Sequence, residues 1–350
     1  MTKCRSRSRS RRSSSGGEVD PTEFGLQLAN LEPARVRSIA QAAEGLGYDL
    51  IVFPDHLVIE GPERQYDPHA LAYDAMVMAA TVADATKRVQ VGHLVLCNLF
   101  RHPAIAAQSL VALDHISRGR LLAGLGTGWT ETEFQMTGIP FPPITERLRM
   151  LDESLECILS LWANERTTFS GEFYQLRDAI LWPKPIQKPH PPIIVGGGGK
   201  GLLRIAAKYA DNINLIPDSG KQGRISLDNV KQMTDESFRR KIDFVREEAK
   251  RRGRDLAAIK FSNFIFTYMI TDSKEATRQT AEMMAAGFGM PSGDAMLQSP
   301  MSLIGTPDEC IAELKRRAKS WGVSQFIFAT AMGIDEAQAR RLYEQVLSHV

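Results

Sequence analysis

Four short stretches of this chain combine residue types that can do chemistry, and each follows an apolar run. The first is Asp55-His56, a carboxylate beside an imidazole directly after the run 50–53. Such a pair offers a proton donor or acceptor that titrates near neutral pH, with a charged group next to it. The structural alternative is an aspartate that caps a loop while the histidine lies in solvent.

The second stretch contains glycines at alternate positions after the apolar run 121–125. Its residues are Gly124, Gly126 and Gly128, with Thr127 and Trp129 among them. Alternate glycines leave one face of a strand end without side chains, so another backbone or a flat ligand can approach closely. A tight turn that needs positive φ is the alternative reading of the same glycines.

The third stretch holds four successive glycines, Gly196, Gly197, Gly198 and Gly199, followed by Lys200 at the start of a predicted helix. Exposed backbone amides and a helix amino end together suit a phosphate or a carboxylate, and Lys200 adds a full charge. The stretch matches neither the Walker pattern nor the GxGxxG dinucleotide fingerprint. We therefore expect it to bind an anionic group in another way.

The fourth stretch, Cys97-Asn98, interrupts an apolar run. No partner in the sequence marks Cys97 as a nucleophile, so we expect both residues to line a pocket. The four cysteines are far apart and show no metal-ligand spacing. This argues against a structural zinc site and suits a reducing cytoplasm.

The elements that must position these stretches alternate regularly along the chain. We predict strands at 24–28, 50–53, 89–96, 121–125, 192–195, 212–216, 259–270 and 325–329. We predict helices at 32–46, 71–85, 103–116, 145–162, 201–209, 227–252, 273–287, 306–321 and 335–347. Eight strand–helix units predict an α/β fold, a (β/α)8 TIM barrel with insertions. An open, doubly wound sheet is the alternative.

Several segments stand apart from this alternation. A hairpin insertion is predicted at 168–181, and irregular loops at 57–68, 130–145 and 288–305. Residues 1–20 form an Arg/Ser-rich leader with almost no apolar side chain, which predicts disorder. The remaining residues, 21–350, are expected to form a single barrel domain.

Composition excludes several classes of protein. The 350 residues carry a net charge of +2, but residues 1–12 hold six basic groups and no acidic one, so the rest of the chain is mildly acidic. That balance gives no reason to expect a nucleic-acid groove, and only the Arg-Ser leader points to RNA. No apolar run approaches the roughly 18 residues that span a bilayer, so we expect no membrane partner.

Longer motifs in the chain resemble the luciferase-like monooxygenase superfamily, and more closely its coenzyme F420 (deazaflavin) dependent oxidoreductases. The motifs are FPDH at 53–56, FRHPAIAAQSLVALDHISRGRLLAGLGTGW at 100–129, ERLRMLDESLECILSLW at 146–162 and FYQLRDAILWPKPIQKPHPPIIVGGGGK at 173–200. The resemblance covers about residues 22–348. It implies a barrel that binds its cofactor at the carboxyl ends of the strands.

The resemblance also implies roles for individual residues. Asp55 and His56 would approach the deazaflavin ring, with His56 handling the proton. A non-proline cis peptide would support the ring near Leu94-Val95, with Cys97 and Asn98 at the ring edge. The glycine segments 126–128 and 196–199 would contact the cofactor's polar tail. Some sugar-phosphate dehydrogenases of this group carry a catalytic glutamate where this chain has Trp129, which argues against a sugar-phosphate substrate.

The function we predict from these features is a cytoplasmic, homodimeric oxidoreductase that moves a hydride between F420 and a small organic substrate. One alternative is an FMN-dependent monooxygenase that receives reduced flavin from a reductase and uses oxygen. Another is a non-catalytic relative that binds the cofactor, although the Asp55-His56 pair argues against it.

Overall fold

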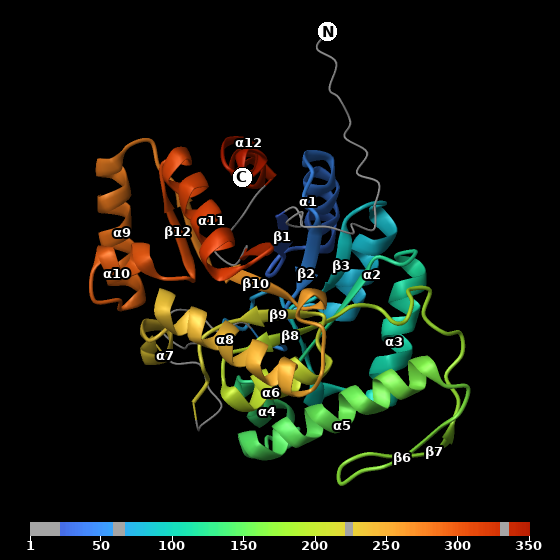
Figure 1. Cartoon of the computed structure of the whole chain (residues 1–350). Helices are drawn as coiled ribbons and strands as arrows, with labels where there is room; N and C mark the ends of the chain where they lie inside the picture. The colour runs from blue at the N-terminus through green and yellow to red at the C-terminus, as the bar shows by residue number, and fades with distance from the viewer. Residues whose placement is uncertain (1–21, 59–66, 221–226, 330–335) are drawn as a thin grey trace.

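The computed structural model describes residues 22–350, apart from 59–66, 221–226 and 330–335. Eight parallel strands form a closed barrel surrounded by helices (Figure 1). The strands are β1 (Glu23–Gln27), β2 (Leu50–Phe53), β3 (Gln90–His93), β5 (Leu121–Gly126), β8 (Ile193–Gly197), β9 (Asn212–Leu215), β10 (Lys260–Ile265) and β13 (Gln325–Ala329). All eight overlap the strands predicted from the sequence.

Strand pairing decides between the two predicted architectures. Each strand of the barrel pairs in parallel with the next one in chain order, and β13 returns to β1 with Phe326 opposite Phe24. The sheet therefore has no open edge. The prediction of a (β/α)8 barrel is confirmed, and the alternative of an open, doubly wound sheet is wrong.

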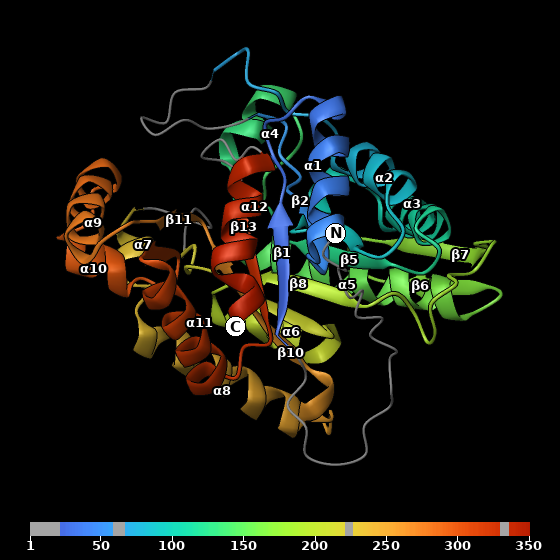
Figure 2. The ribbon, with the colours of Figure 1, turned by 90° about the horizontal axis from the view of Figure 1, so that it is seen from above.

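One long helix packs outside the barrel after each strand. These helices are α1 (Pro33–Leu46), α2 (Ala75–Ala85), α3 (Pro103–Ile116), α5 (Ile144–Ala163), α6 (Lys200–Tyr209), α8 (Asp235–Arg251), α11 (Pro307–Trp321) and α12 (Glu336–Gln345). Three of them begin with proline, which needs no hydrogen-bond acceptor at that position. Figure 2 shows α1 and α12 side by side next to β1.

Side chains alternate along the strands between the barrel lumen and the helical layer, as the period of two requires. An apolar cluster fills the lumen and consists of Leu50, Val52, Leu94, Leu122, Ile194 and Ile327, with Val95 and Phe264 packed against it. The intervening residues, such as Ile51 and Val91, pack against the helices. This alternation fixes which strand-end residues can face a ligand.

A polar network occupies the amino-terminal end of the barrel. Gln325 donates to Glu23 over 2.9 Å, Asn212 donates to Gln325 over 2.9 Å, and Lys260 lies 3.1 Å from Glu23. These groups bind one another, although the buried Asn212 Oδ1 has no partner among the described residues. The chemistry predicted from the sequence therefore falls at the opposite end, where the carboxyl ends of the strands lie.

The predicted hairpin insertion is present as β6 (Thr167–Ser170) and β7 (Gln175–Ala179), an antiparallel pair. In the turn between β6 and β7, the backbone amides of residues 172–174 donate hydrogen bonds to the Glu153 side chain of α5. The hairpin is thereby tied to the barrel, and its residue Tyr174 reaches the strand ends.

Two predicted elements are divided in the structure. The helix predicted at 227–252 is α7 (Leu227–Lys231) followed by α8, because Thr234 and Ser237 form a reciprocal capping box that starts a new helix. The strand predicted at 89–96 is β3 followed by β4 (Leu96–Cys97), with residues 94–95 bulging between them.

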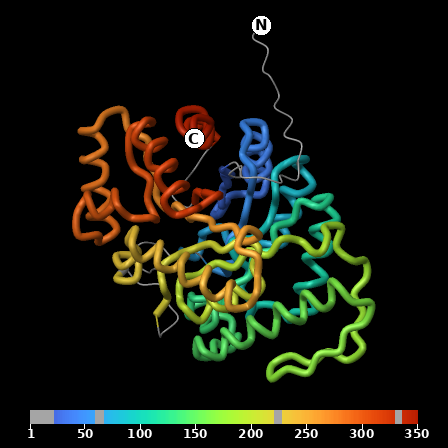
Figure 3. The backbone as a smooth tube through the Cα atoms, viewed as in Figure 1, coloured from blue at the N-terminus to red at the C-terminus, as the bar shows by residue number. Residues whose placement is uncertain are grey.

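The strand predicted at 259–270 is interrupted at Phe266, and only β10 belongs to the barrel. The amides of Phe266 and Thr267 both donate to the Met301 carbonyl, which turns the chain out of the barrel. There β11 (Thr267–Ile270) pairs with β12 (Ser302–Gly305), a strand that the sequence analysis placed in a loop. Helices α9 (Lys274–Phe288) and α10 (Gly293–Gln298) connect β11 to β12 in the sequence, and they lie at one side of the barrel (Figure 3).

The remaining short elements are η1 (Asn98–Phe100), α4 (Glu131–Thr137), η2 (Leu256–Ala258) and η3 (Leu347–His349). Helix α4 lies within the predicted loop 130–145 and follows the glycine run after β5. The Arg/Ser leader and most of the predicted loop 57–68 lie outside the described residues.

Candidate functional site

A surface almost without side chains lies at the carboxyl ends of β3, β5 and β8. The predicted cis peptide bond joins Leu94 to Val95, and Gln27 donates to the Leu94 carbonyl over 2.8 Å. A Cβ atom at Gly126 would lie 2.6 Å from the Val95 side chain, and one at Gly196 would lie 3.2 Å from it. We call Val95, Gly126 and Gly196 the glycine floor. The two glycines make room for the half-buried Val95 side chain, so that the three residues form one low surface.

His56 follows β2, the strand that pairs with β3, and it has a carboxylate partner. Its Nδ1 lies 3.1 and 3.2 Å from the two carboxylate oxygens of Glu133, and its ring meets Trp129 edge-on at 5.6 Å. Since a carboxylate only accepts hydrogen bonds, Nδ1 carries the hydrogen and Nε2 is left to exchange a proton. The His56 side chain is 30% exposed, whereas that of Glu133 is 3% exposed. A ligand can therefore reach the imidazole but not the carboxylate.

Glu133 also fixes the backbone that follows His56. Its Oε1 accepts the amide of Leu57 over 2.7 Å and that of Val58 over 3.3 Å. The residue belongs to α4, which the sequence analysis treated as loop. An acidic residue after the glycine run was the only sequence signal, and it did not distinguish Glu133 from Glu131.

Asp55 turns away from His56 and holds the chain after β3. Its carboxylate forms a bidentate pair with Arg101, at 2.6 and 3.1 Å, and accepts the Cys97 amide over 2.9 Å. Arg101 also binds Asp74 at the start of α2. The Asp55 side chain thus positions the segment around Cys97, and the carboxylate that contacts His56 is Glu133.

Cys97 and Asn98 are buried behind the glycine run. A Cβ atom at Gly128 would lie only 2.7 Å from the Cys97 sulfur. Burial raises the pKa of the Cys97 thiol to about 12. A thiol with that pKa stays protonated near neutrality and is a poor nucleophile. Asn98 donates to the Tyr174 hydroxyl over 3.3 Å, so the hairpin closes this side of the site.

Arg147 of α5 supports the glycine run from beneath. Its guanidinium donates to the Gly128 carbonyl over 2.7 Å and stacks 3.9 Å above the Phe141 ring. Burial lowers the pKa of Arg147 to about 10. Gly128 has φ +73°, a conformation that a side chain would strain, and Thr127 is buried beside it. Nothing in the sequence distinguishes Arg147 from Arg149, the other basic residue of α5.

The four glycines after β8 serve two purposes. Gly196 faces the floor, whereas a Cβ at Gly198 would lie 2.1 Å from the Ile216 carbonyl of the neighbouring backbone. Gly198 therefore permits close approach of two chain segments. A Cβ at Gly197 would meet Leu202 of α6.

Charged groups surround the end of this loop. Gly199 caps α6, and a Cβ there would lie 2.9 Å from the Asp218 carboxylate. Lys241 donates to the Gly198 carbonyl over 2.7 Å, and burial lowers its pKa although Asp218 acts in the opposite direction. The Lys200 ammonium lies 5.8 Å from the Phe244 ring of α8, on the outer side of α6.

Replacing Glu133 by glutamine tests its hold on His56. We expect Glu133→Gln to keep the fold but to lower turnover about tenfold, because an amide stabilises an imidazolium less well than a carboxylate does. Steady-state kinetics as a function of pH would measure the effect. The matched control is Glu131→Gln on the same helix. Equal turnover in the two variants would contradict a role for Glu133.

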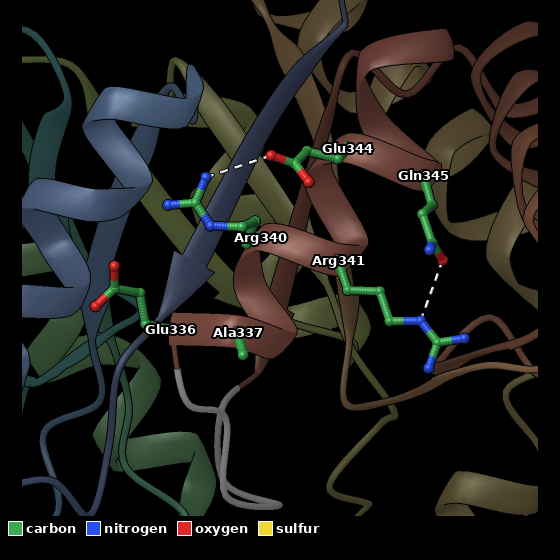
Figure 4. A pocket seen from close by; sticks show the side chains of 6 residues that line it. All are labelled: Glu336, Ala337, Arg340, Arg341, Glu344 and Gln345. Atoms are coloured by element: carbon green, nitrogen blue, oxygen red, sulfur yellow. Dashed lines mark hydrogen bonds and ion pairs between the residues drawn. The ribbon is translucent and has the colours of Figure 1, made fainter.

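A surface hollow lined by α12 lies apart from these groups (Figure 4). Its charged side chains pair with one another or with nearby loops: Arg340 with Glu344, and Arg341 with Gln345 and Asp272. Among the described residues, the charged side chains named here are therefore already engaged.

Two further findings hold for the part of the chain that the structure describes. Within those residues, no three His, Cys, Asp or Glu side chains gather closely enough to hold a metal ion. Likewise, no described helix has the length and apolar character needed to cross a membrane.

Three relatives show the range of similar proteins. An F420-dependent glucose-6-phosphate dehydrogenase of Kineococcus radiotolerans is 37% identical over 57% of this chain and 58% of its own length. A protein of the same name from Nakamurella multipartita is 29% identical over 87% of this chain and 84% of its own. An FMNH2-dependent dimethylsulfone monooxygenase of Pseudomonas putida is 25% identical over 75% of this chain and 68% of its own length.

Solved structures confirm the fold. An F420-dependent tetrahydromethanopterin reductase from Methanopyrus kandleri superposes with a TM-score of 0.72 at 20% identity, over 94% of this chain and 99% of the other. An F420-dependent secondary alcohol dehydrogenase gives a TM-score of 0.73 at 21% identity, with the same coverage. The family model for luciferase-like monooxygenases matches residues 13–241. The chain therefore belongs to the luciferase-like monooxygenase family.

Proposed function

We propose that this protein is an oxidoreductase that transfers a hydride between deazaflavin F420 and a small organic substrate. The observation that carries the proposal is the glycine floor, where the half-buried Val95 side chain lies against Gly126 and Gly196. A flat ring fits such a low surface, and a side chain on either glycine would displace Val95.

The names of two relatives favour deazaflavin over flavin, because both are called F420-dependent. The Pseudomonas putida relative is named for FMNH2 and supports the second candidate, an FMN-dependent monooxygenase. The contact of His56 with Glu133 counts against a non-catalytic binder, because a partner for the imidazole serves proton transfer.

The proposed division of labour follows from the geometry. When bound, F420 supplies the carbon centre that gives or accepts hydride. His56 holds or moves the proton at Nε2, while Glu133 keeps Nδ1 engaged and the ring oriented. Trp129 flanks the imidazole and limits water on one side. Asp55 acts as a positioning residue through Arg101 and the Cys97 amide.

The cofactor's anionic tail is proposed to meet the amino end of α6 at Gly199. Backbone amides there have no partner within their own helix, and the helix end adds positive partial charge. Lys241 offsets the charge of the nearby Asp218. The Lys200 ammonium, which lies over the Phe244 ring, would have to move away from that ring to contact the anionic tail.

The proposal also includes a setting in the cell. Cys97, Cys157 and Cys310 are free and buried, which suits a reducing cytoplasm. We further propose a homodimer, with a reductase that supplies reduced cofactor.

Cofactor titration tests the proposal. Oxidised F420 should bind the full-length protein saturably, with FMN at least tenfold weaker. Gly196→Val should weaken F420 binding at least tenfold because it fills the floor, a loss of about 1.4 kcal/mol. Gly45→Ala is the matched control, since a Cβ at Gly45 would meet nothing within 4 Å. Tighter binding of FMN would favour the monooxygenase, and binding of neither would refute both candidates.

A further inference from the structure

Three aromatic rings lead from the glycine floor to the edge of the barrel. Phe264 packs in the lumen cluster that also contains Val95. Its ring lies 6.3 Å from that of Phe266, which lies 6.2 Å from that of Phe288, edge to face. We call Phe264, Phe266 and Phe288 the aromatic wall. Phe266 is 36% exposed, so the wall is open to a ligand at its middle ring.

The far end of the wall belongs to an apolar cluster between α9 and α10. Phe288 packs there with Met284, Met290, Met296 and Leu297. Unbranched methionine side chains adapt to ligands of different shape. The wall therefore continues from the floor into a surface that suits hydrocarbon groups.

The cation beside the wall is not free to bind an anion. Arg317 is 1% exposed and uses all five of its N–H groups within the protein. It donates to Glu313, Asn263 and the carbonyls of residues 299, 300 and 302. Its guanidinium fixes the segment that orients Phe266 and leaves no donor for a phosphate.

Arg101, the cation that follows η1, is also engaged, since it pairs with Asp55 and Asp74. A phosphorylated sugar would thus meet aromatic rings where it needs charge and hydrogen bonds. An apolar group would bury surface against those rings at a gain of roughly 25 cal/mol per Å².

We infer that the aromatic wall binds the hydrocarbon part of an uncharged, mainly apolar alcohol or ketone. The inference rests on the proposed function and names its substrate class. In oxidation, the carbinol carbon gives its hydride to F420 and the hydroxyl proton passes to His56, which leaves the ketone. Reduction reverses both transfers, so atoms and electrons balance.

Binding of a neutral fluorescent probe, N-phenyl-1-naphthylamine, to the full-length protein without cofactor tests the inference. The probe should bind saturably and be displaced by 2-octanone but not by glucose 6-phosphate. Phe266→Lys should weaken binding at least tenfold, because it replaces the middle ring by a charge. Met283→Lys is the matched control on α9, since Met283 is 64% exposed and lies outside the wall. Thermal unfolding would confirm that both variants fold.

Three results would overturn the inference: no saturable binding of the probe, displacement by glucose 6-phosphate, or equal affinity in the two lysine variants. A change of molar mass in Phe266→Lys with unchanged affinity would instead assign the wall to contact with a second copy of the chain. The test is independent of the cofactor titration. Probe binding without F420 binding would refute the proposed function and its hydride transfer but keep the wall as an apolar binding surface, whereas F420 binding without probe binding would refute the aromatic wall alone.

Discussion

His56→Ala is expected to bind F420 nearly as well as the wild type but to lose about 10²–10⁴ in turnover, the usual contribution of general acid–base catalysis. Hydride transfer to an unsaturated acceptor leaves an anion that needs a proton, and the opposite transfer releases one. The imidazole of His56 is partly exposed after β2, and its Nδ1 is already engaged by Glu133. Removing it takes away the proton-transfer group and leaves the floor intact.

The measurement combines turnover, cofactor affinity and pH. Enones, nitroaromatics, alcohols and imines should be assayed with the cofactor in the matching redox state. One limb of the wild-type pH profile should vanish in His56→Ala. His349→Ala, at an exposed position in the C-terminal η3, is the control. Full turnover with an unchanged pH profile in His56→Ala would remove the residue from the mechanism and direct attention to Trp129.

Acid is expected to destabilise the wild-type protein through a second histidine, His93 at the end of β3. Its side chain is fully buried, and neither ring nitrogen makes a well-aligned hydrogen bond among the described residues. Burial, reinforced by the charge of Arg101, lowers the pKa of His93 from 6.5 to about 3, although the nearby backbone of Ala75 and the charge of Asp74 act in the opposite direction. The folded protein therefore keeps this ring neutral where the unfolded chain would protonate it.

The sign of the effect follows from proton binding. Between pH 6.5 and 3 the unfolded state holds more protons at His93 than the folded state, so the free energy of unfolding falls as pH falls through this range. The loss should reach roughly 3 kcal/mol at pH 4, because each unit of pKa shift corresponds to about 1.4 kcal/mol. The stabilising effect is fully present above pH 6.5.

Urea unfolding between pH 7 and pH 4 measures this loss. His93→Leu removes the titrating group while filling most of its volume, so its stability should fall less steeply with acid than that of the wild type. His349→Leu is the control and should follow the wild type. Parallel curves for wild type and His93→Leu would show that His93 is protonated without cost in the folded protein.

The sequence by itself determined the barrel and the ends of its strands. Strands such as 50–53 and 121–125 are short apolar runs bounded by turn residues, and helices such as 103–116 repeat apolar residues every three to four positions. Both signals are local, so they do not depend on distant contacts. The site stretches at 53–56, 126–129 and 196–199 lie at the same barrel end because every parallel strand points the same way.

The sequence did less well where an element is short or depends on a distant partner. Helix α4 has only seven residues, which is fewer than two helical turns. An apolar pattern with helical spacing cannot repeat over so short a segment, so a loop was predicted there. Strand β12 forms because β11 offers it a partner, and β11 is free to do so only after the chain turns at Phe266. Gly198 likewise depends on a distant segment, because a Cβ there would lie 2.1 Å from the Ile216 carbonyl.

Only the tertiary structure decided which side chains act together. His56 meets Glu133, 77 residues later, rather than its neighbour Asp55, which pairs with Arg101 instead. Adjacent residues at a strand end point in different directions, so proximity in sequence does not predict contact. Closing the barrel brings the ends of distant strands within hydrogen-bond range. The partners of each site residue are therefore set by the closed barrel and its insertions, and no local pattern in the chain encodes them.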